Sequence, residues 1–153
     1  MSIPTFRVDD KVAIVTGAGR GIGRSIAIGL ASAGATVACV DVDESALREV
    51  TAAVAARGRD SLQLLVDLDD STAVAPMVDQ VVDRYGVVDI LINNAGIRVH
   101  KRVLDHSIED WERTFRVNCT APLVASQAVA RTMRDNGGGV IVNVASQMAQ
   151  VTS

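Results

Sequence analysis

Aromatic side chains are scarce in this sequence of 153 residues. They make up 3% of the chain, whereas Ala, Val, Ile and Leu dominate a hydrophobic fraction of 48%. Small and branched apolar side chains fill the narrow space between a parallel sheet and its covering helices, so this composition favours an α/β fold. A chain of this length can bury a core of its own, and we expect a single domain over residues 1–153.

Cysteines are also few, and their pattern disfavours a disulfide or a metal site. Cys39 and Cys119 both lie among apolar or small neighbours, and no C-x-x-C pair is present. His100 and His106 have no cysteine near them in the sequence. We therefore predict two free, buried thiols and no bound metal.

Strong charge of one sign and long apolar runs are both absent. The formal net charge is -3, with acids and bases interspersed, so no basic stripe is available for nucleic-acid phosphates. No apolar run approaches the roughly 18 residues that a membrane-spanning helix needs. Residues 1–10 contain no basic segment followed by a long apolar run, so no secretory signal is visible. We expect a soluble, cytoplasmic protein.

Short apolar runs alternate with segments whose apolar residues recur at helical spacing. The predicted strands are residues 11–16, 35–40, 62–66, 88–92 and 140–144. The predicted helices are residues 21–33, 43–57 and 70–85, a helix that Ser107 and Asp110 open, and residues 122–134. Right-handed crossovers place helices on both faces of such a sheet, so the order predicts a doubly wound parallel sheet, the Rossmann fold. We expect Trp111, in the fourth helix, to lie in the core.

A glycine-rich turn joins the first predicted strand to the first helix. Gly17 permits a tight turn, while Gly21 and Gly23 let a pyrophosphate approach the backbone. The start of the helix supplies oriented N–H groups and a positive partial charge. Glycines also mark ordinary turns, but here they follow a buried strand and open an amphipathic helix that leads to a second strand. This context predicts dinucleotide binding.

Asp41 follows the second predicted strand, 18 residues after Gly23. A carboxylate here accepts hydrogen bonds from both ribose hydroxyls of an adenosine and repels a 2′-phosphate, which favours NAD over NADP. Arg20 favours NADP instead, because a guanidinium in the glycine turn can partly compensate a phosphate. The alternative interpretation of Asp41 is a helix cap, a role that Asp43 and Ser45 also suit.

Four motifs in this order resemble the short-chain dehydrogenase/reductase family. They are Thr16-Gly17-x-x-x-Gly21-Ile22-Gly23, Asn93-Asn94-Ala95-Gly96, Asn118 and Ser146. The glycine spacing resembles the compact branch of that family, and the resemblance extends from Lys11 to Ser146. It implies hydride transfer between a nicotinamide coenzyme and an alcohol or carbonyl substrate.

The resemblance also implies roles for individual residues. Residues that would bind the coenzyme are Gly17, Arg20, Gly21, Ile22, Gly23, Asp41, Asp67, Leu68, Asn94, Ala95 and Gly96. Among them, Asp67 would bond the adenine amino group and Leu68 would pack on its ring, while Asn94, Ala95 and Gly96 would line the ribose and steady the central sheet. Asn118 would hold a water in a proton relay, and Ser146 would bond the substrate oxygen. The simpler alternatives are helix caps at Asp67 and Asn118 and an ordinary serine at Ser146.

The family's acid/base pair is a tyrosine followed four residues later by a lysine, about a dozen residues beyond the serine. No such pair is present before Ser153, since the one tyrosine is Tyr85 and the lysines are Lys11 and Lys101. We therefore expect this chain to be inactive alone and to be an incomplete version of a longer subunit, without the C-terminal strands. The strand over residues 140–144 would then be a bare apolar edge.

The function expected from the sequence is an NAD-dependent oxidoreductase, with NADP less favoured as its coenzyme. The resemblance implies a homodimer or homotetramer with the helix over residues 122–134 at a subunit contact. Two alternatives stay open. One is a dinucleotide-binding module or sensor without catalysis, and the other is an NADP-dependent reductase of 3-oxoacyl groups on acyl-carrier protein.

Overall fold

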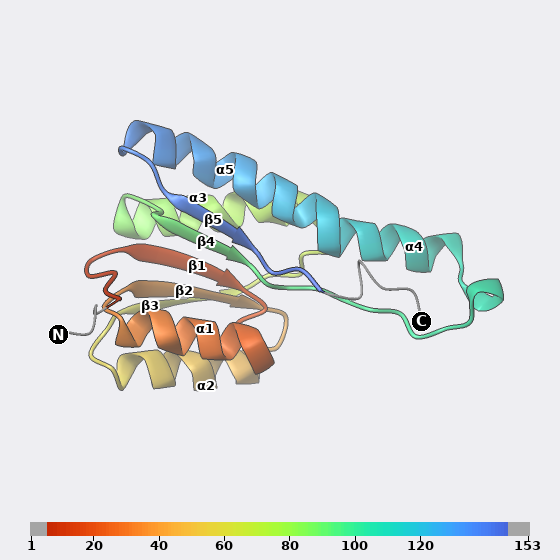
Figure 1. The fold of residues 1–153 in the computed structure, drawn as a ribbon, viewed down its shortest axis with the longest axis horizontal. Helices are drawn as coiled ribbons and strands as arrows, with labels where there is room; N and C mark the ends of the chain where they lie inside the picture. Colours follow the sequence, from red (N-terminus) through yellow and green to blue (C-terminus); the bar gives the residue numbers. More distant parts are fainter. Residues whose placement is uncertain (1–5, 147–153) are drawn as a thin grey trace, which may run out of the picture.

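The computed structural model of the chain describes residues 6–146 and shows one sheet of parallel strands between two layers of helices (Figure 1). The strands are β1 (Val12–Thr16), β2 (Thr36–Asp41), β3 (Ser61–Leu65), β4 (Ile90–Asn93) and β5 (Val140–Asn143). Their order across the sheet is β3-β2-β1-β4-β5, and every neighbouring pair is parallel. The predicted doubly wound Rossmann sheet is therefore confirmed.

The helices cover both faces of this sheet, as the alternating pattern predicted. The helices are α1 (Gly21–Ser32), α2 (Glu44–Ala55), α3 (Val74–Tyr85), α4 (Ile108–Phe115) and α5 (Ala121–Asp135). Short 3₁₀ turns occupy Ser71–Ala73 and Val103–Asp105. Helices α1 and α2 pack together on one face, and α3 and α5 pack together on the other (Figure 1).

Each face of the sheet has its own hydrophobic core, because side chains alternate along a strand. In β1, Val12 and Ile14 belong to the core under α3 and α5, whereas Ala13 and Val15 belong to the core under α1 and α2. All five residues of β1 are buried. A short apolar run ending at a glycine turn therefore predicted a buried strand correctly.

The fourth and fifth helices form one helical run over residues 108–135, where the sequence predicted two separate helices. A π-helical segment, Arg116–Thr120, joins them. The backbone N–H of Ala121 donates to the carbonyl oxygen of Arg116, five residues earlier. The next residue, Pro122, has no N–H for the carbonyl of Asn118, which is a physical reason for the ordinary helical ladder to be interrupted here.

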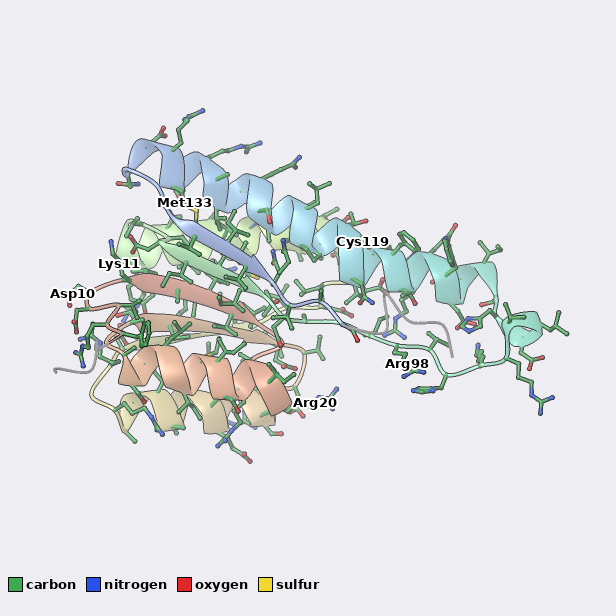
Figure 2. All side chains as sticks on the ribbon, in the orientation of Figure 1. Asp10, Lys11, Arg20, Arg98, Cys119 and Met133 are labelled. Atoms are coloured by element: carbon green, nitrogen blue, oxygen red, sulfur yellow. The ribbon has the colours of Figure 1, made fainter. Side chains whose placement is uncertain are left out.

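Two predictions about burial in this run were wrong. Trp111 is 62% exposed and lies against Phe115, with 4.5 Å between the ring centroids. Cys119 is exposed, whereas Cys39 in β2 is buried as predicted. Both errors have the same cause, since α4 and the π-helical segment extend beyond the end of the sheet, where no second layer from residues 6–146 covers them (Figures 1 and 2).

The last strand, β5, is the apolar edge that the sequence predicted. It pairs with β4 on one side, and all four of its residues are exposed. Val140 and Val142, for example, are 56% and 42% exposed.

Candidate coenzyme site

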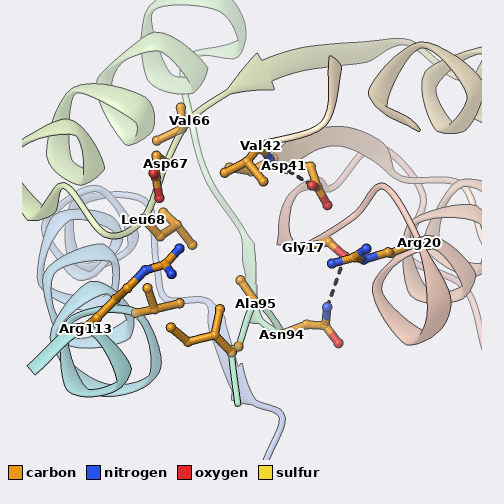
Figure 3. A pocket seen from close by; sticks show the side chains of 14 residues that line it. Gly17, Arg20, Asp41, Val42, Val66, Asp67, Leu68, Asn94, Ala95 and Arg113 are labelled. Carbon is orange, nitrogen blue, oxygen red and sulfur yellow. Dashed lines mark hydrogen bonds between the residues drawn. The ribbon is translucent and has the colours of Figure 1, made fainter. Parts of the chain in front are cut away.

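The site lies at the carboxyl ends of the strands, where the chain reverses its direction of travel across the sheet. From β1 the order runs outward through β2 to β3, and then returns to place β4 on the other side of β1. This switch point is where open α/β sheets bind ligands. A cavity of about 300 Å³ is found there, and the loops after β1, β2, β3 and β4 all contribute to its lining (Figure 3).

Thr16 and Asn94 hold β1 and β4 together beside this cavity. The buried hydroxyl of Thr16 accepts hydrogen bonds from the backbone N–H groups of Asn94 and Ala95, both at 3.0 Å. The side-chain amide of Asn94 donates to the carbonyl oxygens of Thr16 at 2.9 Å and of Gly17 at 3.2 Å. Sequence reasoning quoted Thr16 in the first motif but gave it no role. In the structure the Thr16 hydroxyl fixes the start of the loop after β4 against the end of β1.

The glycine turn is tight for two different reasons. Gly17 has φ of 63°, a left-handed conformation that favours glycine, and it lines the cavity. A Cβ at Gly23 would lie 2.0 Å from the carbonyl oxygen of Gly17 and 2.5 Å from the side-chain nitrogen of Asn94. Gly23 is therefore needed for close packing of α1 against the turn, a different reason from the approach of a pyrophosphate that the sequence suggested.

The start of α1 has no side-chain cap, unlike two other helices of the molecule. In α2 the Asp43 carboxylate accepts from the N–H groups of Ser45 and Ala46, which confirms Asp43 as the cap. Ser107 caps α4 in the same way within a capping box. At α1 the N-cap residue is Arg20, which makes no such bond, and no acid occupies the first turn. The first N–H groups of α1 thus have no side-chain acceptor, as an anion site requires.

Of the remaining residues of this turn, Arg20 lines the cavity, whereas Gly21 and Ile22 border the site without lining it. Gly21 has φ of 54°, and no heavy atom lies within 4 Å of where its Cβ would be. Ile22 is 65% exposed. Arg20 lines the cavity beside Asp41.

Asp41 lies at the end of β2 and connects that strand to the glycine turn. Its Oδ2 accepts from the N–H of Gly19 at 2.9 Å, while Oδ1 accepts from the N–H groups of Val42 at 2.8 Å and Asp43 at 3.2 Å. A carboxylate has about four acceptor positions, so capacity for a ligand hydroxyl remains on Oδ2. Because Asp43 caps α2, Asp41 is not needed for that role.

The opposite wall of the cavity comes from β3 and, unexpectedly, from the α4 run. Asp67 and the buried Leu68 line it, as expected from the resemblance. Arg113 and Val117 line it too, and sequence reasoning missed both. Their spacing of four residues on a predicted helix was the available signal, but nothing in the sequence shows that this helical run lies beside the loop after β3.

A second cavity, of about 400 Å³, adjoins the first, and Ile97 lines both. The side chain of Asn118 fixes Ile97 through two hydrogen bonds of 2.9 Å, in which Oδ1 accepts from the Ile97 N–H and Nδ2 donates to the Ile97 carbonyl oxygen. Ser146 lines this second cavity together with Asn118, so the two expected catalytic residues lie on one site. Gly96, just before Ile97, lines the first cavity.

Within residues 6–146, no cluster of histidine, cysteine, aspartate or glutamate side chains is arranged to hold a metal ion. In the same part of the chain, none of the helices has the length and apolar character needed to cross a membrane.

Comparisons with known proteins agree with this geometry. The chain matches the short chain dehydrogenase family over residues 11–153. It is 41% identical to an uncharacterized oxidoreductase of Thermotoga maritima over 142 residues, which cover 93% of this chain and 56% of that protein.

Two solved structures share its fold. A 7α-hydroxysteroid dehydrogenase complexed with NADH and 7-oxo glycochenodeoxycholic acid has a TM-score of 0.93 at 36% identity, with 97% of this chain and 58% of that chain covered. A blue fluorescent protein from a metagenomic library, in complex with NADPH, has a TM-score of 0.87 at 36% identity, with 93% and 58% covered.

The switch-point cavity, the uncapped helix start and the glycine turn define an α/β protein built to bind a dinucleotide. The chain belongs to the short chain dehydrogenase family. It spans a little more than half the length of the relatives described above.

Proposed function

We propose that this chain is the coenzyme-binding region of an oxidoreductase that transfers hydride between NAD and an alcohol or carbonyl substrate. The observation that carries the proposal is the uncapped start of α1 beside a cavity that also contains the Asp41 carboxylate. The helix start suits a diphosphate, and Asp41 suits a ribose whose hydroxyls are free. The related steroid dehydrogenase, with NADH and a 7-oxo compound bound, supports the class of reaction.

The residues divide into those that hold the coenzyme and those that act on the substrate. In the first cavity Asp41 accepts from the ribose, Asp67 accepts from the adenine amino group and Leu68 packs on the ring. A bound nicotinamide supplies the hydride acceptor or donor. In the second cavity the Ser146 hydroxyl bonds the substrate oxygen. The carbonyl oxygen of Asn118, which Pro122 cannot use as a helical acceptor, has capacity for a water in the proton relay.

A titration of the intact protein with NADH and with NADPH tests the proposal. We expect NADH to bind more tightly, and we expect Asp41→Ala to reduce that preference about tenfold, equivalent to about 1.4 kcal/mol. Asp43→Asn is the matched control, because asparagine keeps the cap of α2, and the preference should not change. Absence of binding by either coenzyme would refute the function, whereas an unchanged preference in Asp41→Ala would refute the NAD assignment alone.

Turnover distinguishes the enzyme from the alternative of a dinucleotide sensor. The proposal requires the intact protein to oxidise or reduce some alcohol or carbonyl compound while it consumes coenzyme. Tight binding with no turnover across a broad panel of alcohols and ketones would favour the sensor instead.

We also propose that the intact protein is a homodimer or homotetramer with α5 at a subunit contact. The helical run over residues 108–135 exposes Trp111, Phe115 and Leu123, and exposed apolar side chains on this run suit such a contact. Light scattering that finds a monomer at micromolar concentration would contradict this proposal.

A further inference from the structure

Arg113 closes the side of the first cavity that faces Asp41. It comes from α4, while Arg20 and Asp41 come from the opposite wall, next to the glycine turn (Figure 3). The guanidinium of Arg113 points toward the cavity beside Leu68, at the end that the resemblance assigns to the adenine ring (Figure 3). Its side chain is 54% exposed, so a ligand can reach it.

The carboxylate of Asp69 forms an ion pair with Arg113 through one oxygen and with Arg116 through the other. The Nε of Arg116 lies 2.7 Å from Oδ1 of Asp69, and the Nε of Arg113 lies 3.5 Å from Oδ2. The hydrogen bond from Arg116 lowers the pKa of Asp69, so this carboxylate stays ionised between the two cations.

The two arginines differ in how much of their bonding capacity is used. Arg116 also contacts Glu109 at 2.8 Å and Glu112 at 3.9 Å, so three carboxylates surround it. Among residues 6–146, Asp69 is the acid that pairs with Arg113. Arg116 therefore secures Asp69, while Arg113 keeps its terminal nitrogens and the flat face of its guanidinium for something else.

We propose that Arg113 is a specificity-determining residue for the adenine end of the coenzyme, with its planar guanidinium stacked on the purine and its Nε edge held by Asp69. Arginine is suited to this contact because its charge is spread over a flat group that stacks on aromatic faces. A stacking contact tolerates any base, whereas a hydrogen bond from the adenine amino group to Asp67 does not. This inference rests on the proposed function, because it requires an adenine dinucleotide in the first cavity.

Binding of three nucleotides to the intact protein tests the proposal. The probes are NADH, its analogue with hypoxanthine in place of adenine, and nicotinamide mononucleotide, which has no purine. We expect Arg113→Ala to raise the Kd of both dinucleotides by the same factor, about three- to tenfold, a range typical of a partly exposed cation–π contact. The Kd of the mononucleotide should not change.

Three further variants make the result specific. Arg113→Lys should recover less than half of the loss, because an ammonium keeps the charge but has no flat face. Asp67→Ala should weaken NADH and leave the hypoxanthine analogue unaffected. Arg131→Ala, an exposed arginine on α5, is the matched control and should bind all three probes as the unmodified protein does.

The combination of Arg113→Ala with Asp69→Asn tests how Arg113 is held. If Asp69 acts by positioning Arg113, the double variant should bind NADH no more weakly than Arg113→Ala alone. A loss of NADH affinity in the double variant equal to the sum of the losses in Arg113→Ala and Asp69→Asn would contradict that arrangement.

Several outcomes would overturn the inference. Unchanged NADH binding by Arg113→Ala would contradict the proposed stacking contact. Complete recovery of NADH affinity by Arg113→Lys would show that the charge alone matters. An equal loss for the mononucleotide would place Arg113 at the other end of the coenzyme. Failure of the unmodified protein to bind NADH would instead refute the proposed function, so the two failures are distinguishable.

Discussion

The two adjoining cavities are held in shape by different means. The first is built from backbone at the ends of buried strands, with a glycine turn and the Thr16 hydroxyl fixing it. The second lies under the exposed α4 run, and the side chain of Asn118 fixes its border at Ile97. The first cavity therefore depends on close backbone approach at the glycine turn and on one buried hydroxyl, whereas the border of the second depends on a side chain of the α4 run.

Among the substitutions at the first cavity, we expect Gly23→Ala to have the largest effect on stability and coenzyme binding. The added methyl group would meet the Gly17 carbonyl oxygen at 2.0 Å, and backbone must move to relieve the clash. We expect a loss of at least about 3 kcal/mol in the free energy of unfolding, together with loss of coenzyme binding. Denaturant unfolding and a coenzyme titration of the intact protein measure the two effects.

Gly29→Ala in the same helix is the matched control. Apart from its chain neighbours and the nearby backbone of α1, nothing in the part of the chain that the structure describes lies within 4 Å of its Cβ position, so the substitution only replaces a flexible residue in a helix interior. We expect it to stabilise the protein by about 0.5–1 kcal/mol. A loss at Gly29 as large as that at Gly23 would show that the approach to Gly17 does not explain the effect at Gly23.

Thr16→Val tests the same cavity by removing one oxygen without changing the shape of the side chain. The N–H groups of Asn94 and Ala95 would lose their acceptor, and we expect the free energy of unfolding to fall by about 3 kcal/mol. Thr16→Ser keeps the hydroxyl, and its free energy of unfolding should fall much less. A Thr16→Val protein as stable as its parent would mean that water replaces the hydroxyl.

Asn118→Ala breaks the second cavity while sparing the first. Loss of both bonds to Ile97 should lower the free energy of unfolding by about 2 kcal/mol. We expect kcat to fall at least about 100-fold, since the proton relay is lost, while the Kd of NADH changes little. Asn118→Asp keeps the acceptor but not the donor. We expect its stability and its kcat to lie between those of Asn118→Ala and those of the unmodified protein. An equal loss in NADH affinity would show that the two cavities are not separately held.

The smallest expected effect is at the start of α4, beside the second cavity. Hydrogen bonds from Lys101, and then from Ser107, lower the pKa of Asp110. Because the folded pKa is below the unfolded one, the stabilisation by this carboxylate is fully present above the unfolded pKa. It decreases below that pKa and is lost as the pH falls through the folded pKa. Asp110→Asn should therefore be less stable than its parent at pH 7, with the difference shrinking toward pH 3. A difference that stays constant with pH in thermal unfolding would contradict the assignment.

The sequence predicted the fold well because the relevant signals are local. Strand β1 is a short apolar run followed by glycines, and Ser107 with Asp110 marked the start of α4 correctly. The errors at Trp111 and Cys119 arose because helical periodicity shows which face is apolar but not whether anything covers that face. Continuity from α4 through the π-helical segment was missed because Pro122 reads as a helix start.

The candidate site was predictable where one motif contains the whole feature. The glycine turn and Asp41 lie on one β-α-β unit, and the structure places Gly17 and Asp41 on the same cavity. The position of Arg113 on the cavity could not be predicted, because it depends on how α4 lies beside the loop after β3. The pairing of Asn118 with Ile97 likewise joins residues 21 positions apart, and no spacing rule relates them.

The three hydrogen bonds that Asp41 accepts from backbone N–H groups affect how this protein would acquire a different coenzyme preference. Exchanging this acid for a neutral or basic residue would remove an electrostatic barrier to a 2′-phosphate, yet it would also release the N–H of Gly19 and loosen the loop that the diphosphate needs. A single substitution should thus relax selectivity without improving affinity for the phosphorylated coenzyme. An evolutionary or engineered switch needs a companion change that anchors residue 19 again.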